Sequence, residues 1–452
     1  MRVRLIVGWL VVLTMVAAIG YAQAPPVRKL SLADALDVAR QNNPDYLKAL
    51  AEHSPAAWAL TNATASLFTP TLGVQGGYSY RAAAAGQNIQ GLQVGSTPTI
   101  NQTSAGVGLN YQLSGTSFSN RGYAAAQLRA ADQDAASAYN VLQTNVRRDY
   151  ITLLEARAQA DLAEHVVTRA QELLNLAQAR YNVGQNTMID VRQAQVTKGN
   201  ADVALLQARQ NVDVQVLTLF QDMGVPAPVP PRVEPTDSFP VVEPSFDPDS
   251  LVALALRANP ILLANQARQR ATRWSVRGAY SQYLPSLAAS ASTGKQWTRL
   301  GAYTSSLGGA ARAIPDTSYS QSSPWQVSLQ LTLPIYDGFS RNVQIGQANL
   351  ADEQARQTVR AQELQVRSSV VGAYLALMTA YRTIAVQANN RTAAEDALSL
   401  ATERYRVGSG SIIELNDAQV AAEQAGVTYI NAVYDYHKAI AALEQAVGQP
   451  LR

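Results

Sequence analysis

Arg-Tyr-Asn-Val-Gly at residues 180–184 and Arg-Tyr-Arg-Val-Gly at residues 404–408 are two copies of one motif, 224 residues apart. An acidic residue follows each copy, Asp190 in the first and Glu414 in the second. Further identities at the same offset are Ala194-Gln195-Val196 with Ala418-Gln419-Val420, Tyr150 with Tyr374, Gly224 with Gly448, and Pro226 with Pro450. A constant offset over such a length indicates an internal duplication, so the sequence predicts two structural repeats of about 200 residues each.

The composition indicates an exported protein. Arg2 and Arg4, an apolar run and the small-x-small tripeptide Ala22-Gln23-Ala24 are typical of a secretory signal over residues 1–24. The chain has no cysteine, which excludes disulfides and thiolate metal sites and fits the bacterial envelope. The net charge of +3 gives no sign of nucleic-acid binding.

Four segments alternate between apolar and polar residues: 71–80, 103–113, 286–297 and 325–333. Period-two alternation over about 10 residues is typical of strands in an outer-membrane barrel. An ordinary soluble antiparallel sheet shows the same pattern, so alternation alone leaves both interpretations open. Residues 81–102 and 298–324 are expected to be exposed loops, and Trp297 and Trp325 are expected at strand ends, in an aromatic belt or in ordinary strand packing.

Long helices are predicted after each strand pair. No proline occurs between residues 340 and 407, and Val370, Leu377, Ile384, Leu398 and Tyr405 follow a seven-residue grid. Such spacing is typical of helices that wind into a left-handed supercoil. At 1.5 Å per residue each long helix would extend roughly 100 Å. No run of 18 or more apolar residues follows the signal, so no transmembrane helix is predicted.

These elements define the expected organisation. The signal, residues 1–24, precedes a first repeat, 25–224, with a strand pair at about 70–115 and a helical hairpin at about 120–222. A linker with eight prolines, residues 225–248, leads to the second repeat, 249–452. That repeat contains a strand pair at about 285–336 and a helical hairpin at about 340–446. Trp58 and Trp274 are expected to pack between helices.

The order of these features, found twice, resembles the TolC-type outer-membrane efflux family. The resemblance implies an α+β membrane protein of the outer membrane with a large periplasmic portion. It implies a homotrimer in which each protomer gives four strands to one transmembrane β-barrel and long coiled-coil helices to a periplasmic α-barrel. The strand count agrees, because four strands cannot close a barrel by themselves.

The resemblance also implies the partners and the function. The chain would be the outer-membrane exit duct of a tripartite efflux or secretion system, surrounded by outer-membrane lipid. It would conduct solutes passively from an inner-membrane pump, through a periplasmic adaptor protein, to the exterior. No catalytic constellation, metal-ligand spacing or cofactor motif is present in the sequence, so neither enzyme activity nor a cofactor is expected. The alternative is a structural periplasmic coiled-coil protein with a small soluble sheet.

The candidate site residues lie at the two turns. The resemblance assigns adaptor docking to the turn residues Val183, Gly184, Val407 and Gly408, although a plain helical hairpin would need the same glycines. It assigns the entrance constriction to Asp190, Tyr405, Glu414 and Asp417, where rings of carboxylates would attract cations. Asp190 and Glu414 also fit helix capping, which we favour for Glu414.

The resemblance fails at one position. In the family a tyrosine, an arginine and an aspartate link neighbouring helices in the closed entrance. Tyr405 and Asp190 match two of these positions, but the basic position is Gly410 here. Arg404 and Arg406 are candidates to replace the missing arginine. Because the acidic residues are more numerous after the second turn, we expect gating to reside mainly there.

Overall fold

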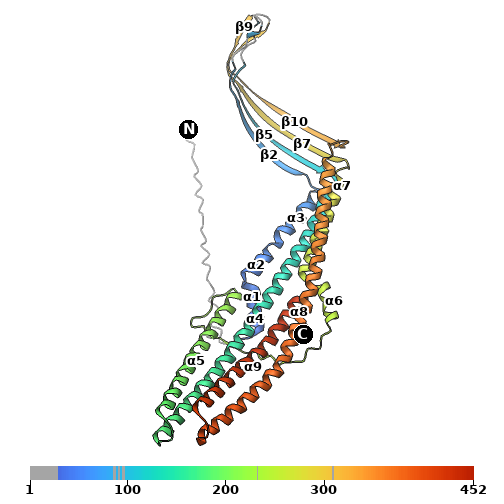
Figure 1. Cartoon of the computed structure of the whole chain (residues 1–452). Helices are drawn as coiled ribbons and strands as arrows, with labels where there is room; N and C mark the ends of the chain where they lie inside the picture. The colour runs from blue at the N-terminus through green and yellow to red at the C-terminus, as the bar shows by residue number, and fades with distance from the viewer. Residues whose placement is uncertain are drawn as a thin grey trace, which may run out of the picture.

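The computed structural model describes residues 29–84, 88–89, 92–93, 97–231, 233–307 and 310–451. The predicted signal, residues 1–24, lies outside the described residues. A curved antiparallel sheet occupies one end of the molecule, and long helices extend away from it (Figure 1). At the end farthest from the sheet, each long helix is followed by a turn and a returning helix.

Two helical hairpins form the long part of the molecule. The outgoing helices α4 (Gly115–Asn182) and α8 (Ser340–Val407) are each 68 residues long, which corresponds to about 100 Å. The returning helices are α5 (Met188–Asp222) and α9 (Ile412–Val447). At the far end of the molecule α4 and α9 lie in the middle of the helical layer, with α5 and α8 outside them (Figure 1).

Shorter helices lead into each strand pair. They are α1 (Leu32–Asn42), α2 (Pro44–Ala51) and α3 (His53–Ala65) in the first half, and α6 (Pro248–Ala258) and α7 (Pro260–Ser281) in the second. The sequence predicts one helix after each Asn-Pro pair, but the first half contains two, separated at Glu52. Pro55 explains the break, because it has no N–H to bond the carbonyl of Ala51.

The two tryptophans at matching places in these helices behave differently. A Cβ atom at Gly122 of α4 would lie 2.3 Å from the ring of Trp274, so this ring packs directly on the α4 backbone. Trp58 in α3 is 70% exposed. The prediction of helix packing is therefore correct for Trp274 and wrong for Trp58 within a single chain.

The four long strands form one sheet in the order β10-β7-β5-β2, with every neighbouring pair antiparallel. The strands are β2 (Thr71–Arg81), β5 (Ile100–Leu113), β7 (Ser286–Leu300) and β10 (Thr317–Thr332). The pairing of β5 with β7 joins the two halves of the chain. In this register Leu72, Leu109, Ala291 and Val327 form one row across the sheet.

The strands of the second half extend farther than predicted. Because β7 continues to Leu300 and β10 begins at Thr317, Trp297 and Trp325 lie inside strands and not at their ends. Two further short strands, β8 (Tyr303–Leu307) and β9 (Ala310–Ile314), pair within the segment predicted to be a loop. In these strand extensions and short strands, hydrogen bonds to the neighbouring strand keep Ser- and Thr-rich residues extended, although their sequence shows no apolar alternation.

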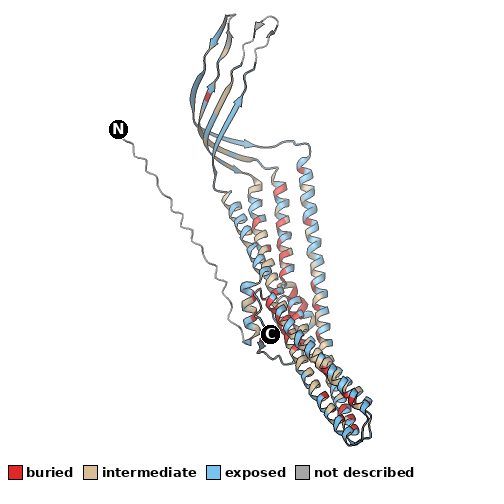
Figure 2. Cartoon of the chain, turned by 90° about the vertical axis from the view of Figure 1, so that its left-hand side faces the viewer, coloured by how far each residue is buried: buried red, intermediate tan, exposed pale blue. Residues whose placement is uncertain are grey.

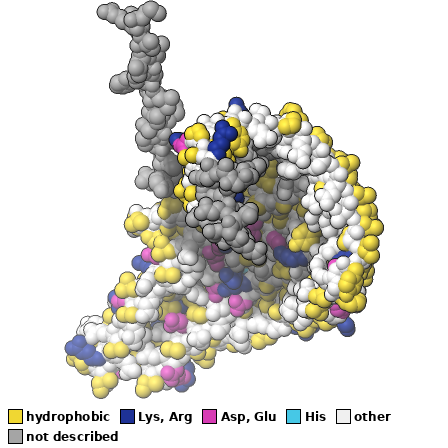
Figure 3. Space-filling view, turned by 90° about the horizontal axis from the view of Figure 1, so that it is seen from above, with side chains coloured by type: hydrophobic (Ala, Val, Ile, Leu, Met, Phe, Trp, Pro, Cys, Tyr) yellow, Lys and Arg dark blue, Asp and Glu magenta, His cyan; other side chains and the backbone are white. Residues whose placement is uncertain are grey.

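Among the described residues, no helix or second sheet covers this sheet (Figures 1 and 2). Val327, Leu329 and Leu331 of β10 are at least 70% exposed. Seen along the long axis, the sheet is an open arc with hydrophobic side chains gathered along its outer rim (Figure 3). A soluble sheet buries its apolar face, so this arrangement argues against the soluble alternative.

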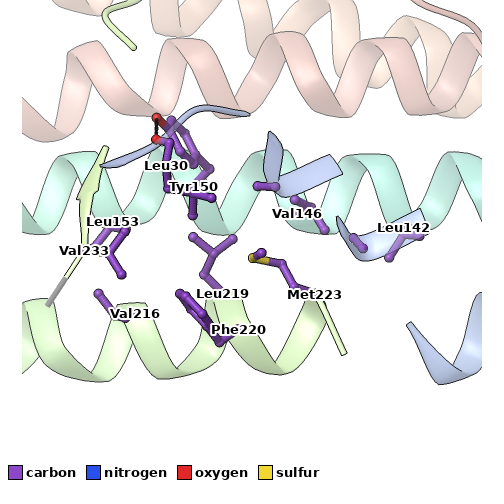
Figure 4. Close-up of a cluster of buried hydrophobic side chains, with 12 residues drawn as sticks. Leu30, Leu142, Val146, Tyr150, Leu153, Val216, Leu219, Phe220, Met223 and Val233 are labelled. Carbon is purple, nitrogen blue, oxygen red and sulfur yellow. Dashed lines mark hydrogen bonds between the residues drawn. The ribbon is translucent and has the colours of Figure 1, made fainter. Parts of the chain in front are cut away.

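Buried side chains cluster where the short helices meet the hairpins and also near the two turns, where all four long helices contribute. One cluster joins α1, α4 and α5 around Val146, Tyr150 and Leu219 (Figure 4). The Tyr150 hydroxyl lies 2.9 Å from the carbonyl oxygen of Leu30 and 2.7 Å from Oδ2 of Asp237. The cluster therefore holds both the start of the described chain and part of the segment 225–248.

The proline-rich segment 225–248 is tied to both halves of the chain. Its strand β6 (Glu234–Pro235) pairs in parallel with β1 (Lys29–Leu30). Farther along, the carbonyl oxygen of Val242 accepts a hydrogen bond from the Tyr436 hydroxyl of α9. These contacts hold the segment against helices of both halves.

The sequence predicts no membrane span after the signal, but one stretch of α8 has the length and composition of a span. Among the described residues, α8 alone contains an 18-residue stretch long and apolar enough for a span, with a mean hydropathy of 1.3. Only 11% of that stretch is buried. The prediction counted uninterrupted apolar runs, whereas this stretch tolerates polar residues. In the fold α8 pairs with α9, which is the arrangement of a hairpin helix.

Candidate functional site

The two hairpin turns have the same backbone design. Gly184 follows α4 with φ of +78°, and Gly408 follows α8 with φ of +86°. Residues with a side chain rarely adopt this left-handed conformation, so glycine is required at both helix ends. The preceding valines point into solvent, with Val183 69% exposed and Val407 68% exposed. Each turn therefore presents an apolar side chain at the tip of the molecule.

The helices after the turns are capped in different ways. Thr187 and Asp190 form a complete capping box, in which the Thr187 N–H donates to Asp190 Oδ2 at 2.9 Å. At the start of α9 the Glu414 N–H donates to Ser411 Oγ at 3.1 Å, but the Glu414 carboxylate does not return the bond. The structure thus reverses the preference for Glu414 as the capping residue, because its carboxylate has a cationic partner.

That partner is Arg404, whose guanidinium forms an ion pair with Glu414 inside the second hairpin. Arg406 pairs with Glu403 at 2.8 Å, also within its own hairpin. The two arginines considered as replacements for the missing basic residue are therefore occupied locally. Asp417 lies one turn beyond Glu414 and is exposed.

Tyr405 is the buried centre of the tip, with only 3% of its surface exposed. Its hydroxyl accepts a hydrogen bond from Nδ2 of Asn186 at 2.6 Å. Its backbone carbonyl accepts a bond from Nη1 of Arg180, whose guanidinium carbon lies 5.2 Å from the ring centroid. We call Arg180, Asn186 and Asp190 the Tyr405 socket. All three belong to the first hairpin, whereas Tyr405 ends α8 of the second.

The socket changes the acidity of the tyrosine. Burial raises the pKa of Tyr405, and the negative charge of Asp190 raises it further. The Asn186 hydrogen bond and the positive charge of Arg180 act in the opposite direction. The net pKa is above the usual value for tyrosine, so the hydroxyl keeps its proton at neutral pH.

Sequence reasoning identified Tyr405 and Asp190 but missed Arg180 and Asn186. Arg180 was visible, since it opens the quoted motif, but nothing in the sequence shows that it reaches across to α8. The residue at the matching position of the second repeat, 224 residues later, is Gly410. Aligning the two repeats would therefore have marked Asn186 as a position at which they differ. Only the packing of one hairpin on the other reveals these contacts.

The side chains at the tip can act through their charges and through the shape of the surface that they form. Among the described residues, no group of three or more His, Asp or Glu side chains is arranged to hold a metal ion. The structure places Asp190, Tyr405, Glu414 and Asp417 around the two turns. The Asp190 charge acts on Tyr405, and Glu414 forms an ion pair with Arg404.

The fold is that of solved outer-membrane channels. The channel from Campylobacter jejuni, CmeC, matches with a TM-score of 0.73 and 18% identity, over 92% of this chain and 85% of that one. VceC from Vibrio cholerae matches with a TM-score of 0.72 and 18% identity, over 93% of this chain and 97% of that one.

The sequence defines the family. The profile described as outer membrane efflux protein matches residues 35–225 and 251–449, and the chain belongs to this family. TolC of Escherichia coli is 27% identical over 411 residues, which cover 88% of this chain and 78% of TolC. The efflux protein BepC of Brucella suis is 26% identical over 300 residues, 66% of this chain and 61% of BepC. The chain is thus an efflux protein of the outer membrane.

Proposed function

We propose that three copies of this chain form one exit duct, with a shared transmembrane β-barrel and a periplasmic α-barrel. The main support is the open sheet. Strands β2 and β10 are its two edges and have no further strand beside them among the described residues. Unpaired edges are unfavourable in lipid, and four strands cannot close a barrel. Neighbouring copies would pair β10 of one chain with β2 of the next.

The helices support the same assembly. The two outer helices each carry exposed apolar residues separated by seven positions or multiples of seven. On α5 and α8 they are Ile189, Val196, Val203 and Leu217, and Val343, Leu350, Leu364 and Val371, each at least 40% exposed. Such stripes pack against a partner helix in coiled coils. A second copy placed beside α5 or α8 would cover them.

The two turns would form the periplasmic entrance and meet an adaptor protein. Val183, Gly184, Val407 and Gly408 would make the docking surface, since both valines are exposed at the tip. Asp190, Tyr405, Glu414 and Asp417 would form the constriction, as rings repeated by the symmetry of the trimer. Solutes would move passively, with energy from an inner-membrane pump, and the chain itself would catalyse no reaction.

The test is assembly and conduction by the purified chain. We expect particles of trimer mass in detergent, and ion-conducting channels when these particles are added to planar lipid bilayers. Arg257→Ala is a suitable control variant, because Arg257 is exposed in the last turn of α6, belongs to neither turn and neither stripe, and forms no ion pair among the described residues. A monomer that stays soluble without detergent and never conducts would overturn the proposal.

A further inference from the structure

The Tyr405 socket joins the two hairpins of one chain at the tip. Tyr405 belongs to the last turn of α8, while Arg180 ends α4 and Asn186 lies in the turn after it. The tip cannot widen between these hairpins unless Tyr405 leaves the socket and the apolar cluster that it shares with Leu173 and Ala177 separates. The socket therefore contributes, together with this cluster, to how easily the hairpins separate.

Arg180 makes two contacts with Tyr405 that act together. Carbonyl groups in the last turn of a helix lack partners and form the negative end of the helix dipole, so a cation is favourable there. The planar guanidinium also stacks on the tyrosine ring, which an ammonium group does less well. Because Tyr405 is nearly fully buried, these contacts lie in a medium of low dielectric constant and are strengthened.

Arg180 also packs closely against the turn that follows α8. A Cβ atom added at Gly408 would lie 3.0 Å from Nη2 of Arg180. The glycine that permits the α8 turn thus also permits the close approach of the guanidinium. One residue of the repeated motif serves both the turn and the joint.

Within one chain, the described residues form no such joint at the repeat-related position of the second hairpin. Arg404 corresponds to Arg180, but it pairs with Glu414 of its own hairpin. Gly410 corresponds to Asn186 and has no side chain to donate a hydrogen bond. Tyr181, which corresponds to Tyr405, is 36% exposed. Among the described residues of one chain, the motif therefore occurs twice and the socket once.

We propose that Arg180 is the positioning residue that locks the closed entrance, in the role that the absent basic residue at position 410 would have filled. The lock holds α8 against the first hairpin of the same chain. The residue that makes this contact, Arg180, belongs to the first hairpin, although the sequence favoured the second hairpin for gating. This proposal rests on the proposed function, since an entrance exists only if the chains form a duct.

The experiment compares Arg180→Ala, Arg180→Lys and the control Arg257→Ala in the full-length protein. The chain has no cysteine, so spin labels can be attached at Gln185→Cys and Ser409→Cys, one in each turn. Labelled chains are assembled with an excess of unlabelled chains, and the distance between the two labels is measured by electron paramagnetic resonance. Channel conductance is measured on the unlabelled variants.

We expect Arg180→Ala to shift the ratio of open to closed entrances on the order of tenfold, since a charge-assisted hydrogen bond is lost. The label distance and the conductance should both rise. Arg180→Lys should give an intermediate shift, because it keeps the charge and loses the planar fork. Arg257→Ala should match the wild-type protein in both measurements.

The outcomes separate the lock from the duct. If the wild-type protein conducts and Arg180→Ala changes neither distance nor conductance, the lock is wrong. If the wild-type protein does not conduct but Arg180→Ala lengthens the distance, the joint between hairpins is supported and the duct is wrong. If Arg180→Ala does not assemble, Arg180→Lys decides, and an unchanged distance in that variant overturns the lock.

Discussion

Asp149→Asn should stabilise the protein at alkaline pH and leave its stability almost unchanged in acid. Asp149 lies in α4 and is only 8% exposed. No N–H or O–H donor among the described residues reaches its buried Oδ2 atom. Burial raises the pKa of Asp149 to about 7, and the neighbouring Asp222 raises it as well, through a hydrogen bond that favours the protonated form and through its negative charge. Arg148, 3.8 Å away, lowers it but does not compensate.

The magnitude follows from the two pKa values. The pKa rises from 3.8 to about 7, a difference of about 3, and each pKa unit corresponds to 1.36 kcal/mol. Between these values the folded protein holds a proton that the unfolded chain has lost, so stability falls as the pH rises through this window. Above about pH 7 the full penalty, on the order of 4 kcal/mol for the Asp149–Asp222 pair, is present. Asparagine is never charged, so the variant avoids the penalty.

Thermal unfolding followed by circular dichroism, in detergent at about pH 4.5 and pH 8, measures this difference. The melting temperature of Asp149→Asn should exceed that of the wild-type protein at the higher pH, and the gap should nearly close at the lower one. Asp213→Asn, an exposed acid of α5, is the matched control and should show no such dependence. Equal effects at both pH values, or a loss of stability at the higher pH, would refute the reasoning.

Two further predictions concern packing and conduction. Gly122→Ala would place a Cβ atom 2.3 Å from the Trp274 ring and should cost about 1–3 kcal/mol, seen as a lower melting temperature. Gly199→Ala, a helical glycine with nothing within 4 Å, should be neutral or gain up to about 1 kcal/mol, and equal melting temperatures for the two variants would contradict the packing argument. Glu414→Ala combined with Asp417→Ala should reduce the preference for cations in bilayer recordings. An unchanged ion selectivity would remove both residues from the constriction.

The elements with a strong period were predictable. The long helices and the apolar alternation of β10 follow directly from local spacing, because a side chain's direction repeats every 3.6 residues in a helix and every two in a strand. The ends of elements were less predictable. Pro55 divides a helix that the pattern joins, and β7 and β10 continue through polar residues that have no alternation. There hydrogen bonds to a neighbouring strand decide, and local sequence does not contain them.

The candidate site shows the same division. The sequence identified both turns, their glycines and the acidic residues after them. It did not identify the Tyr405 socket, because its members are separated by more than 200 residues along the chain. The sequence also favoured helix capping for the Glu414 carboxylate. In the structure this carboxylate pairs with Arg404, and the carboxylate that completes a capping box is that of Asp190.

The sequence by itself determined the duplication, the long hairpins, the strand segments and the family resemblance, since each of these depends on residues close together or on a constant offset. The tertiary structure decided how the halves combine. It joined the strand pairs into one open sheet with two unpaired edges, and it joined the hairpins through Arg180 and Tyr405. Two nearly identical motifs thus became different, because each side chain's partner depends on what packs against it, and a repeated sequence does not carry that information.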